Sequence, residues 1–289
     1  MNGPLRRGPR PAHGRRRIPR ERLPLPALLL ASLAIAFFAL PLAGLAWRAP
    51  WSQAGRILTD PGLRAALRLS LVCSLWATAA SALFGVPLAW LLARVRFPGR
   101  AAIRALCTLS MVLPPVVGGV ALFAALGRRG LAGQWLDRWF GLRLAFTTPG
   151  VVLAQTFVAM PFLVLTVEAA LRQHDQGLDE AARTLGASPW YRFRRVTLPA
   201  VRPAVIAGAV LAWARALGEF GATITFAGNY PGRTQTLPIA TYLALETEPD
   251  DAIMLSLVLI ATSFAVLLGL RDRWLGVAEP DATIPQAKS

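Results

Sequence analysis

The sequence predicts an all-helical protein that crosses a membrane about six times. Of its 289 residues, 55% are hydrophobic and only 16% are charged. The apolar residues form long blocks rather than the alternation of a strand or the single stripe of a surface helix. A hydrocarbon core of about 30 Å needs about 20 apolar residues of helix. Because unpaired backbone groups are costly in lipid, blocks of that length must be helices.

Six blocks approach the length that a crossing needs, and the fourth is the shortest. They are Ala27 to Trp47, Leu69 to Leu92, Ala105 to Leu126, Val151 to Val167, Ala204 to Phe226, and Ala252 to Leu270. With their connecting loops they define one transmembrane domain over residues 26–271. The remaining residues, 272–289, form a short tail.

Residues 1–25 form an Arg- and Pro-rich tail that we expect to be disordered and cytoplasmic. The tail holds eight arginines, and the whole chain carries a net charge of +16. No aromatic residue lies between these arginines, and the tail directly precedes the first block. We therefore predict a flank that contacts membrane lipid, and no nucleic acid partner. The first block is about twice as long as the apolar part of a signal peptide, so we interpret it as an uncleaved span.

The distribution of arginines predicts the orientation. With the N-terminus inside, the inner segments carry 21 Lys or Arg in about 93 residues, and the outer segments carry 9 in about 70. Positive residues concentrate on the cytoplasmic side of membrane proteins. We therefore predict a multi-pass protein of the cell membrane with both termini in the cytoplasm.

Several kinds of chemistry are excluded by residues that the chain lacks. The only lysine is Lys288, so no phosphate-binding G-x-x-x-x-G-K-[ST] loop exists, and any ATP must be hydrolysed by a partner. The only histidines, His13 and His174, lie in polar segments, and Glu219 is the only acid well inside a span. We expect no catalytic residue, metal site or cofactor in this chain, and we interpret the two cysteines as small packing residues: Cys73 and Cys107.

A polar loop over residues 172–203 separates the fourth and fifth blocks. Leu178, Ala181, Ala182 and Leu185 recur at helical spacing, which predicts a short amphipathic helix ending near Gly186. Ser188 and Pro189 then cap and begin a second short helix, which carries Trp190, Tyr191 and Phe193, and Pro199 closes the unit. Such a hairpin fits a groove in another protein, or lies flat on lipid headgroups. Amphipathicity alone leaves both interpretations open.

The spacing within this loop resembles the EAA loop of ABC-importer permeases, E-A-A-x-x-x-G-x(9)-I-x-L-P. The matching residues are Glu180, Ala181, Ala182, Gly186, Val196, Leu198 and Pro199, with valine in place of isoleucine as the one departure. The resemblance implies that the loop forms coupling helices seated in the cleft of a separate cytoplasmic ATPase. That partner would bind the ATP and Mg²⁺, and its closure would rock the bundle between inward- and outward-open states.

Four further stretches resemble the molybdate permease branch of the molybdate, tungstate and sulfate importers. They are "ILTDP" at Ile57 to Pro61, "LPPVVGG" at Leu113 to Gly119, "GRRG" at Gly127 to Gly130, and "ARALGEFGATITFAGN" at Ala214 to Asn229. The resemblance implies a type I importer bundle that works as a pair of identical copies, with two ATPase subunits and an extracytoplasmic binding protein. Tungstate and sulfate stay open as alternative substrates, because sulfate permeases share some of these elements.

Residues inside the spans are candidates for the translocation path. Two prolines and two glycines either kink or break the third span or line the path: Pro114, Pro115, Gly118 and Gly119.

Arg215 and Glu219 lie four residues apart in the fifth span, and a charge buried alone in lipid is costly. We favour a neutralised pair that fixes packing over a charge that attracts the anion. Thr223, Thr225 and Asn229 offer neutral hydrogen-bonding groups near the outer end.

An aromatic and basic hairpin follows the third block. It contains Arg128, Arg129, Trp135, Arg138, Trp139, Phe140 and Arg143, and we expect it to lie at the membrane interface. It and Gly228 to Thr236 are the expected contacts of a docking binding protein.

Two functions of other classes compete with the importer. An ion-coupled secondary carrier would use Glu219 and Arg215, but such carriers have paired halves, and we find no internal repeat. An intramembrane enzyme is disfavoured by the few polar groups within the spans.

Overall fold

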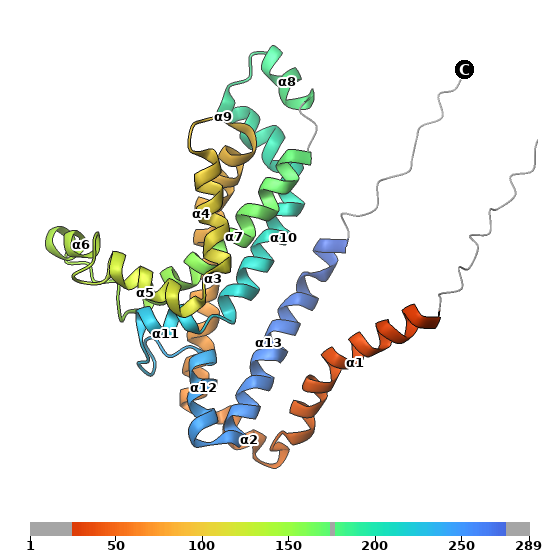
Figure 1. Ribbon diagram of the computed structural model, residues 1–289, viewed down its shortest axis with the longest axis vertical. Coiled ribbons are helices and arrows are strands. Elements are labelled where there is room, and N and C mark those ends of the chain that lie inside the picture. Colours follow the sequence, from red (N-terminus) through yellow and green to blue (C-terminus); the bar gives the residue numbers. More distant parts are fainter. Residues whose placement is uncertain (1–24, 174–176, 276–289) are drawn as a thin grey trace, which may run out of the picture. The chain divides into compact units, whose positions relative to one another are not determined.

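The computed structural model describes residues 25–173 and 177–275 of the chain (Figure 1). The expected disordered tail, residues 1–25, and the C-terminal tail, residues 272–289, therefore lie outside the described residues except at Leu25 and 272–275. The described part is helical and contains no strand, as the predicted fold class requires. It divides into two units, residues 1–47 and 48–289, and each is described by itself.

Five helices are long and apolar enough to cross a membrane. In the first unit this helix is α1 (Leu25–Arg48), which has 24 residues, none of them buried. The other four lie in the second unit: Pro61–Arg94, Thr148–Gln173, Pro189–Leu217 and Pro249–Gly269.

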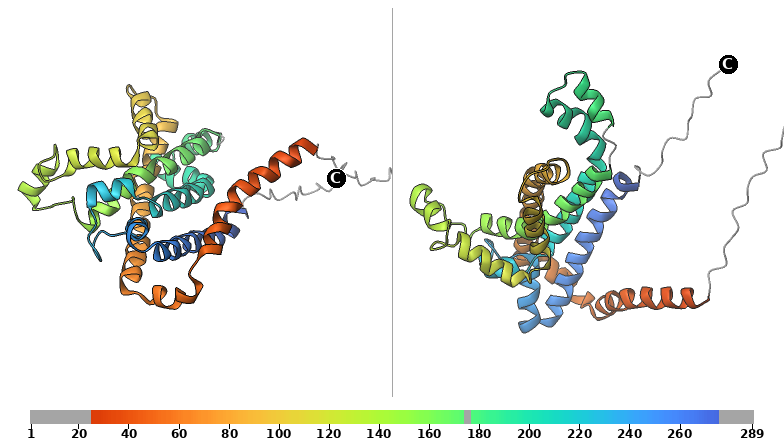
Figure 2. Two further views of the ribbon diagram at one scale, coloured as in Figure 1. Left: turned by 60° about the horizontal axis from the view of Figure 1, so that its bottom comes forward. Right: turned by 45° about the horizontal axis from the view of Figure 1, so that its top comes forward.

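Three long helices form the centre of the second unit: α3 (Pro61–Arg94), α7 (Thr148–Gln173) and α10 (Leu198–Leu217). They lie side by side in both views of Figure 2. Small residues allow this close approach. A Cβ atom at Gly85 of α3 would lie 3.1 Å from Leu163, and one at Gly208 of α10 would lie 3.2 Å from the Cα atom of the same leucine. Close backbone packing of this kind holds helices together in lipid, where apolar burial alone gives little driving force.

One end of this unit carries α2 (Ala54–Thr59), α12 (Leu237–Thr247) and the start of α13 (Pro249–Leu275) (Figure 1). Asp60 caps α3 by accepting a hydrogen bond of 2.8 Å from the Leu63 amide, and Pro61 occupies the first helical position. Ser70 of α3 accepts a 2.7 Å bond from the amide of Leu237, the first residue of α12. The sequence analysis did not predict α12, because its 11 residues are too few to cross a membrane.

The predicted third span, Ala105 to Leu126, is two helices rather than one: α4 (Arg100–Val112) and α5 (Pro115–Leu126). Leu113 and Pro114 between them have ψ angles of 131°, which is extended backbone. Two consecutive prolines explain the break, because each disfavours helical backbone in the residue before it.

The predicted fifth span also differs from the structure. The helix begins earlier, with α9 (Pro189–Arg192) and a π-helical turn, η2 (Phe193–Thr197), that continue directly into α10. The prediction that Pro199 closes the loop was therefore wrong. Proline lacks an amide proton and its ring collides with the carbonyl four residues earlier, and the wider π turn just before Pro199 provides the space. The helix ends at Leu217, and α11 (Gly221–Ala227) follows after a break.

A charged cluster joins α4 to α7. Oε1 of Glu168 accepts hydrogen bonds from Nε of Arg104 at 3.1 Å and from Nη2 of Arg172 at 2.8 Å. Nη2 of Arg104 also reaches the Leu92 carbonyl of α3 at 3.4 Å. Glu168 is buried, so the cluster fixes three helices at one level.

Candidate functional site

The polar loop forms a helical hairpin at the end of the second unit opposite α12 (Figure 1). Its first helix is α8 (Gly177–Thr184) and its second begins with α9. Ser188 caps α9, accepting a 3.3 Å hydrogen bond from the Tyr191 amide, and Pro189 occupies the first turn. These are the caps that the sequence predicts, and they set the direction of the second helix.

Gly186 makes the turn between the two helices. Its φ angle is +81°, in the left-handed region where a side chain is strained. The amide of Ala187 bonds to the Ala182 carbonyl at 3.0 Å, which closes the end of α8. No atom lies within 4 Å of a Cβ built at Gly186. Glycine is therefore required here by the backbone conformation and not by lack of space.

Large apolar side chains on this hairpin are exposed. Leu185 is 88% exposed, Trp190 68% and Leu178 62%. A hollow of about 460 Å³ lies between the two helices, lined by Ala182, Leu185, Gly186, Ala187, Ser188 and Tyr191. These exposed apolar side chains make the hairpin a candidate contact surface for another molecule.

Aromatic contacts join the hairpin to the long helices. The Phe193 ring stacks on Trp190 at 5.7 Å between centroids and meets Trp90 of α3 edge-on at 5.8 Å. Phe193 also packs against the central core of α3, α7 and α10. Phe193 therefore connects the hairpin to α3, and α9 is continuous with α10.

The residues that carry the EAA resemblance occupy several positions in this hairpin. Glu180 and Ala181 are exposed on α8, and Ala182 lines the hollow. The later members fall on the continuous helix, where Val196 and Leu198 are half-buried and Pro199 is exposed. The structure thus brings Ala182 and Gly186 together at the turn, while Val196 to Pro199 connect the hairpin to α10.

The four proline and glycine candidates lie where α5 packs against α11 and α7. A Cβ atom at Gly119 would stand 2.7 Å from Cβ of Thr225 and 2.9 Å from the carbonyl oxygen of Ala222. A Cβ at Gly221 would stand 2.8 Å from Pro115, and one at Gly118 would stand 3.2 Å from the ring of Phe157. Gly118 and Gly119 are buried, whereas Pro114 and Pro115 are exposed. Gly119 thus allows close contact with the backbone of α11, and Gly118 leaves room for the Phe157 ring. The role of both glycines in a path stays a prediction.

Arg215 and Glu219 form an ion pair with 2.6 Å between Nη1 and Oε2. The other carboxylate oxygen of Glu219 accepts a 2.8 Å bond from the Ala222 amide at the start of α11. Glu219 is 1% exposed. The carboxylate therefore both neutralises the arginine and holds the break between α10 and α11, which agrees with the favoured packing interpretation.

The neutral candidates differ in their hydrogen bonding. The Thr225 hydroxyl donates to the Gly221 carbonyl at 2.7 Å. Thr223 Oγ1 and Asn229 Oδ1 are buried and have no hydrogen-bond partner within the described residues. Gln155 of α7, which the sequence analysis missed, is fully buried with both amide atoms unpaired. Its only sequence signal is a polar residue in the middle of an apolar block.

The basic hairpin contains α6 (Gly133–Phe140). Asp137 accepts hydrogen bonds from Nε of Arg143 at 2.9 Å and of Arg128 at 3.0 Å. These two bonds hold the pKa of the Asp137 carboxyl below its ordinary value. The Trp135 and Trp139 rings lie 5.2 Å apart. The location of this hairpin at a membrane interface stays a prediction.

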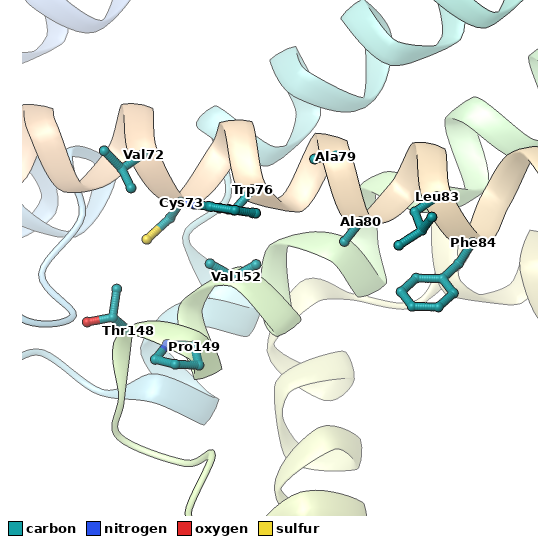
Figure 3. Close-up of a pocket in the computed structure, with 10 residues that line it drawn as sticks. All are labelled: Val72, Cys73, Trp76, Ala79, Ala80, Leu83, Phe84, Thr148, Pro149 and Val152. Carbon is teal, nitrogen blue, oxygen red and sulfur yellow. The ribbon is translucent and has the colours of Figure 1, made fainter.

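A groove of about 690 Å³ between α3 and the start of α7 is apolar (Figure 3). Figure 3 shows Cys73 on the side of α3 that faces Thr148 and Val152 of α7. Trp76, Leu83 and Phe84 continue the lining along α3. The Thr148 hydroxyl donates to the Arg233 carbonyl, so this groove offers an anion little to bind.

The bundle, its broken helices and the polar hairpin are features of a transport protein subunit, and comparison with known families agrees. The family model described as binding-protein-dependent transport system inner membrane component matches residues 85–278. The chain belongs to this family and is a multi-pass protein of the inner membrane. The predicted resemblance to importer permeases is thereby confirmed at the level of the family.

Individual relatives are more specific. The chain is 46% identical to the molybdenum transport system permease protein ModB of Mycobacterium tuberculosis (strain ATCC 25618 / H37Rv), over 87% of this chain and 95% of the relative. It is 35% identical to the sulfate transport system permease protein CysT of Escherichia coli (strain K12), over 76% of this chain and 79% of the relative.

Among solved structures, the chain is similar to a bacterial ABC transporter involved in the import of the acidic polysaccharide alginate. The TM-score is 0.69 at 19% identity, and the similarity covers 88% of this chain and 96% of that chain. At this identity the likeness shows the fold alone.

Proposed function

We propose that this chain is the membrane-spanning permease subunit of an ATP-driven importer, and that its substrate is molybdate. The observation that carries the substrate is the 46% identity to a molybdenum permease over nearly the whole of both chains, against 35% to a sulfate permease. Sulfate and tungstate are the alternatives, because all three are divalent tetrahedral oxyanions.

A separate ATPase drives transport in this proposal. The α8–α9 hairpin is its docking site, with Glu180, Ala181, Ala182, Gly186, Val196, Leu198 and Pro199 forming the EAA loop. Support comes from the exposed Leu185 and Trp190 and from the left-handed turn at Gly186. The partner binds ATP and Mg²⁺, since the single lysine of this chain lies at position 288. The chain itself is not an enzyme.

The hairpin end lies in the cytoplasm, as do both termini, and the α2–α12 end lies outside. A second copy of the chain completes the path, and an extracytoplasmic binding protein delivers the anion. Closure of two ATPase subunits moves α9, and the aromatic contacts of Phe193 carry that motion to α3 while the continuous helix carries it to α10. The bundle then alternates between outward- and inward-open states.

Uptake by reconstituted vesicles tests the class of transporter. The permease is purified with the molybdate-importer ATPase of the same organism, and the binding protein is added outside. We expect uptake of radioactive molybdate that requires ATP and survives a proton uncoupler. Uptake that needs no ATP and collapses with the proton gradient would instead identify an ion-coupled carrier that uses Arg215 and Glu219.

A matched pair of variants tests the docking surface. Leu185→Glu places a charge on the most exposed leucine of the hairpin, and Leu131→Glu does the same at an 80% exposed leucine before α6. We expect Leu185→Glu to lose the ATPase on co-purification and Leu131→Glu to retain it. Equal retention by both variants would exclude the hairpin as the docking site.

Competition tests the substrate. Excess unlabelled molybdate should abolish labelled uptake, and an equal excess of sulfate should leave most of it. Stronger inhibition by sulfate would reassign the permease to that anion.

A further inference from the structure

A second groove runs along one face of α4. It has a volume of about 470 Å³ and is lined by Ala101, Arg104, Ala105, Thr108, Leu109 and Val112. A liquid water molecule occupies about 30 Å³, so the groove can hold a small anion with several waters. Arg104 lies one turn from the start of α4, and Val112 ends the helix.

The charge beside this groove is not balanced within its cluster. Arg104 and Arg172 both bind a single oxygen of Glu168, so two guanidinium groups share one carboxylate. Nη1 of Arg104 has no hydrogen bond to the described residues, and the side chain is 34% exposed while that of Glu168 is 5% exposed. One turn earlier, Nε of Arg100 is buried and has no partner in the described part of the chain. The surplus positive charge of the cluster is therefore partly exposed, at Arg104 and at Arg172, whose side chain is 46% exposed, and of these two only Arg104 lines the α4 groove.

The remaining lining offers an anion little besides this guanidinium. The Thr108 hydroxyl proton is already used, because it donates to the Arg104 carbonyl at 3.0 Å. A guanidinium presents parallel N–H groups that match two oxygens of a tetrahedral oxyanion. One such contact in an otherwise apolar groove attracts an anion and holds it weakly, which suits release.

We propose that the α4 groove is an anion site at the inner mouth of the permease, where Arg104 binds a divalent tetrahedral oxyanion before its release. The proposal rests on the function above, because that function places the hairpin end in the cytoplasm and makes the anion a substrate. It adds Arg104 to a path for which the sequence indicated only candidates within residues 114–119 and 215–229.

Thiol labelling tests the site in the complete permease–ATPase complex. Thr108→Cys is introduced with Cys107→Ser, since Cys107 is a neighbouring half-buried thiol, and Cys73 is fully buried. The complex is placed in phosphatidylcholine nanodiscs and treated with an anionic and with a cationic methanethiosulfonate. Residues four apart on a helix are neighbours, so Arg104 should favour the anionic reagent at position 108.

Three variants at two positions separate charge, geometry and general effects. Arg104→Gln should lower the anionic-to-cationic rate ratio at least about threefold, because it removes a unit charge beside the thiol. It should still fold, since Glu168 keeps its bond to Arg172. Arg104→Lys should keep the ratio and weaken protection by molybdate. Arg202→Gln removes an equal charge from α10 and should change neither the rate ratio nor the protection by molybdate.

Molybdate at millimolar concentration should slow the anionic reagent with Arg104 present and have no effect on Arg104→Gln. An unchanged rate ratio in Arg104→Gln, or no protection by molybdate, overturns the proposal. An anionic lipid headgroup offers similar oxygens, so the measurement is repeated in phosphatidylglycerol. Protection by that lipid without protection by molybdate assigns the groove to lipid and also overturns the proposal. A complex that imports molybdate but shows no protection refutes this site alone, whereas one that imports none refutes the proposed function.

Discussion

Replacing Gly186 with valine separates coupling to the ATPase from folding of the bundle. The φ angle of +81° costs a residue with a Cβ atom about 1–2 kcal/mol, and more for a β-branched one. No atom lies within 4 Å of the new Cβ, so the cost is backbone strain without a collision. A strain of about 2 kcal/mol lowers the population of the native left-handed turn roughly 30-fold relative to other conformations of the same turn. The strain lies in an exposed hairpin, so the long helices should remain packed.

The assay is molybdate-dependent ATP hydrolysis and uptake in reconstituted vesicles. Gly186→Val should insert and purify normally and lose most of both activities. Gly186→Asn should retain them, because asparagine tolerates the left-handed region. Gly141→Val is the matched control, since Gly141 has φ +63° and free space around it at the end of α6. Normal uptake by Gly186→Val, or an equal loss in Gly141→Val, would refute the reasoning.

Three further predictions concern packing and charge. Gly119→Ala should destabilise the protein by about 1–3 kcal/mol in thermal unfolding, because its Cβ meets Thr225 and the Ala222 carbonyl, whereas Gly218→Ala, with 3.8 Å of clearance, should be nearly neutral. Glu219→Ala should lower the stability by about 3–5 kcal/mol in the same measurement, because it leaves the partly buried Arg215 without its partner and removes the acceptor of the Ala222 amide. Glu219→Gln should lower the stability less, since its side-chain carbonyl can still accept the hydrogen bond from Ala222. The pKa of Asp137 is lowered, so its bonds to the two arginines stabilise the α6 hairpin fully at pH values above 3.8, the ordinary pKa, and this stabilisation is lost as the pH falls through the lowered pKa. The fluorescence of the nearby tryptophan pair should change in that pH range, and Asp137→Asn should abolish the change.

The turns of the polar hairpin were predictable because they depend on neighbouring residues. A left-handed glycine at 186, a capping serine at 188 and a proline in the first helical turn are local requirements of backbone geometry. The continuation of the second helix into α10 was not predictable in this way. Proline usually marks an end, and here a π turn accommodates Pro199 inside a longer helix.

Broken helices limited the prediction of the spans. The proline pair indicated a break or kink in the third block, but composition alone did not show that α4 and α5 are separate helices. The gap before α11 carries no proline, and Glu219 was interpreted as a charge paired with Arg215 rather than as the acceptor of the Ala222 amide. Helix α12 was missed because an 11-residue apolar run resembles a loop when the criterion is crossing length.

The sequence by itself determined that this protein is a helical membrane protein without a G-x-x-x-x-G-K-[ST] loop, with a capped polar hairpin between two spans. These properties follow from composition and from local backbone chemistry, which need no knowledge of distant contacts. The tertiary structure decided which polar groups meet. The sequence assigned no partner to Glu168, yet it joins Arg172 of the same helix and Arg104, which lies 64 residues away in sequence. Such pairs depend on how helices pack in three dimensions, because the spacing along one chain segment carries no information about the face of another.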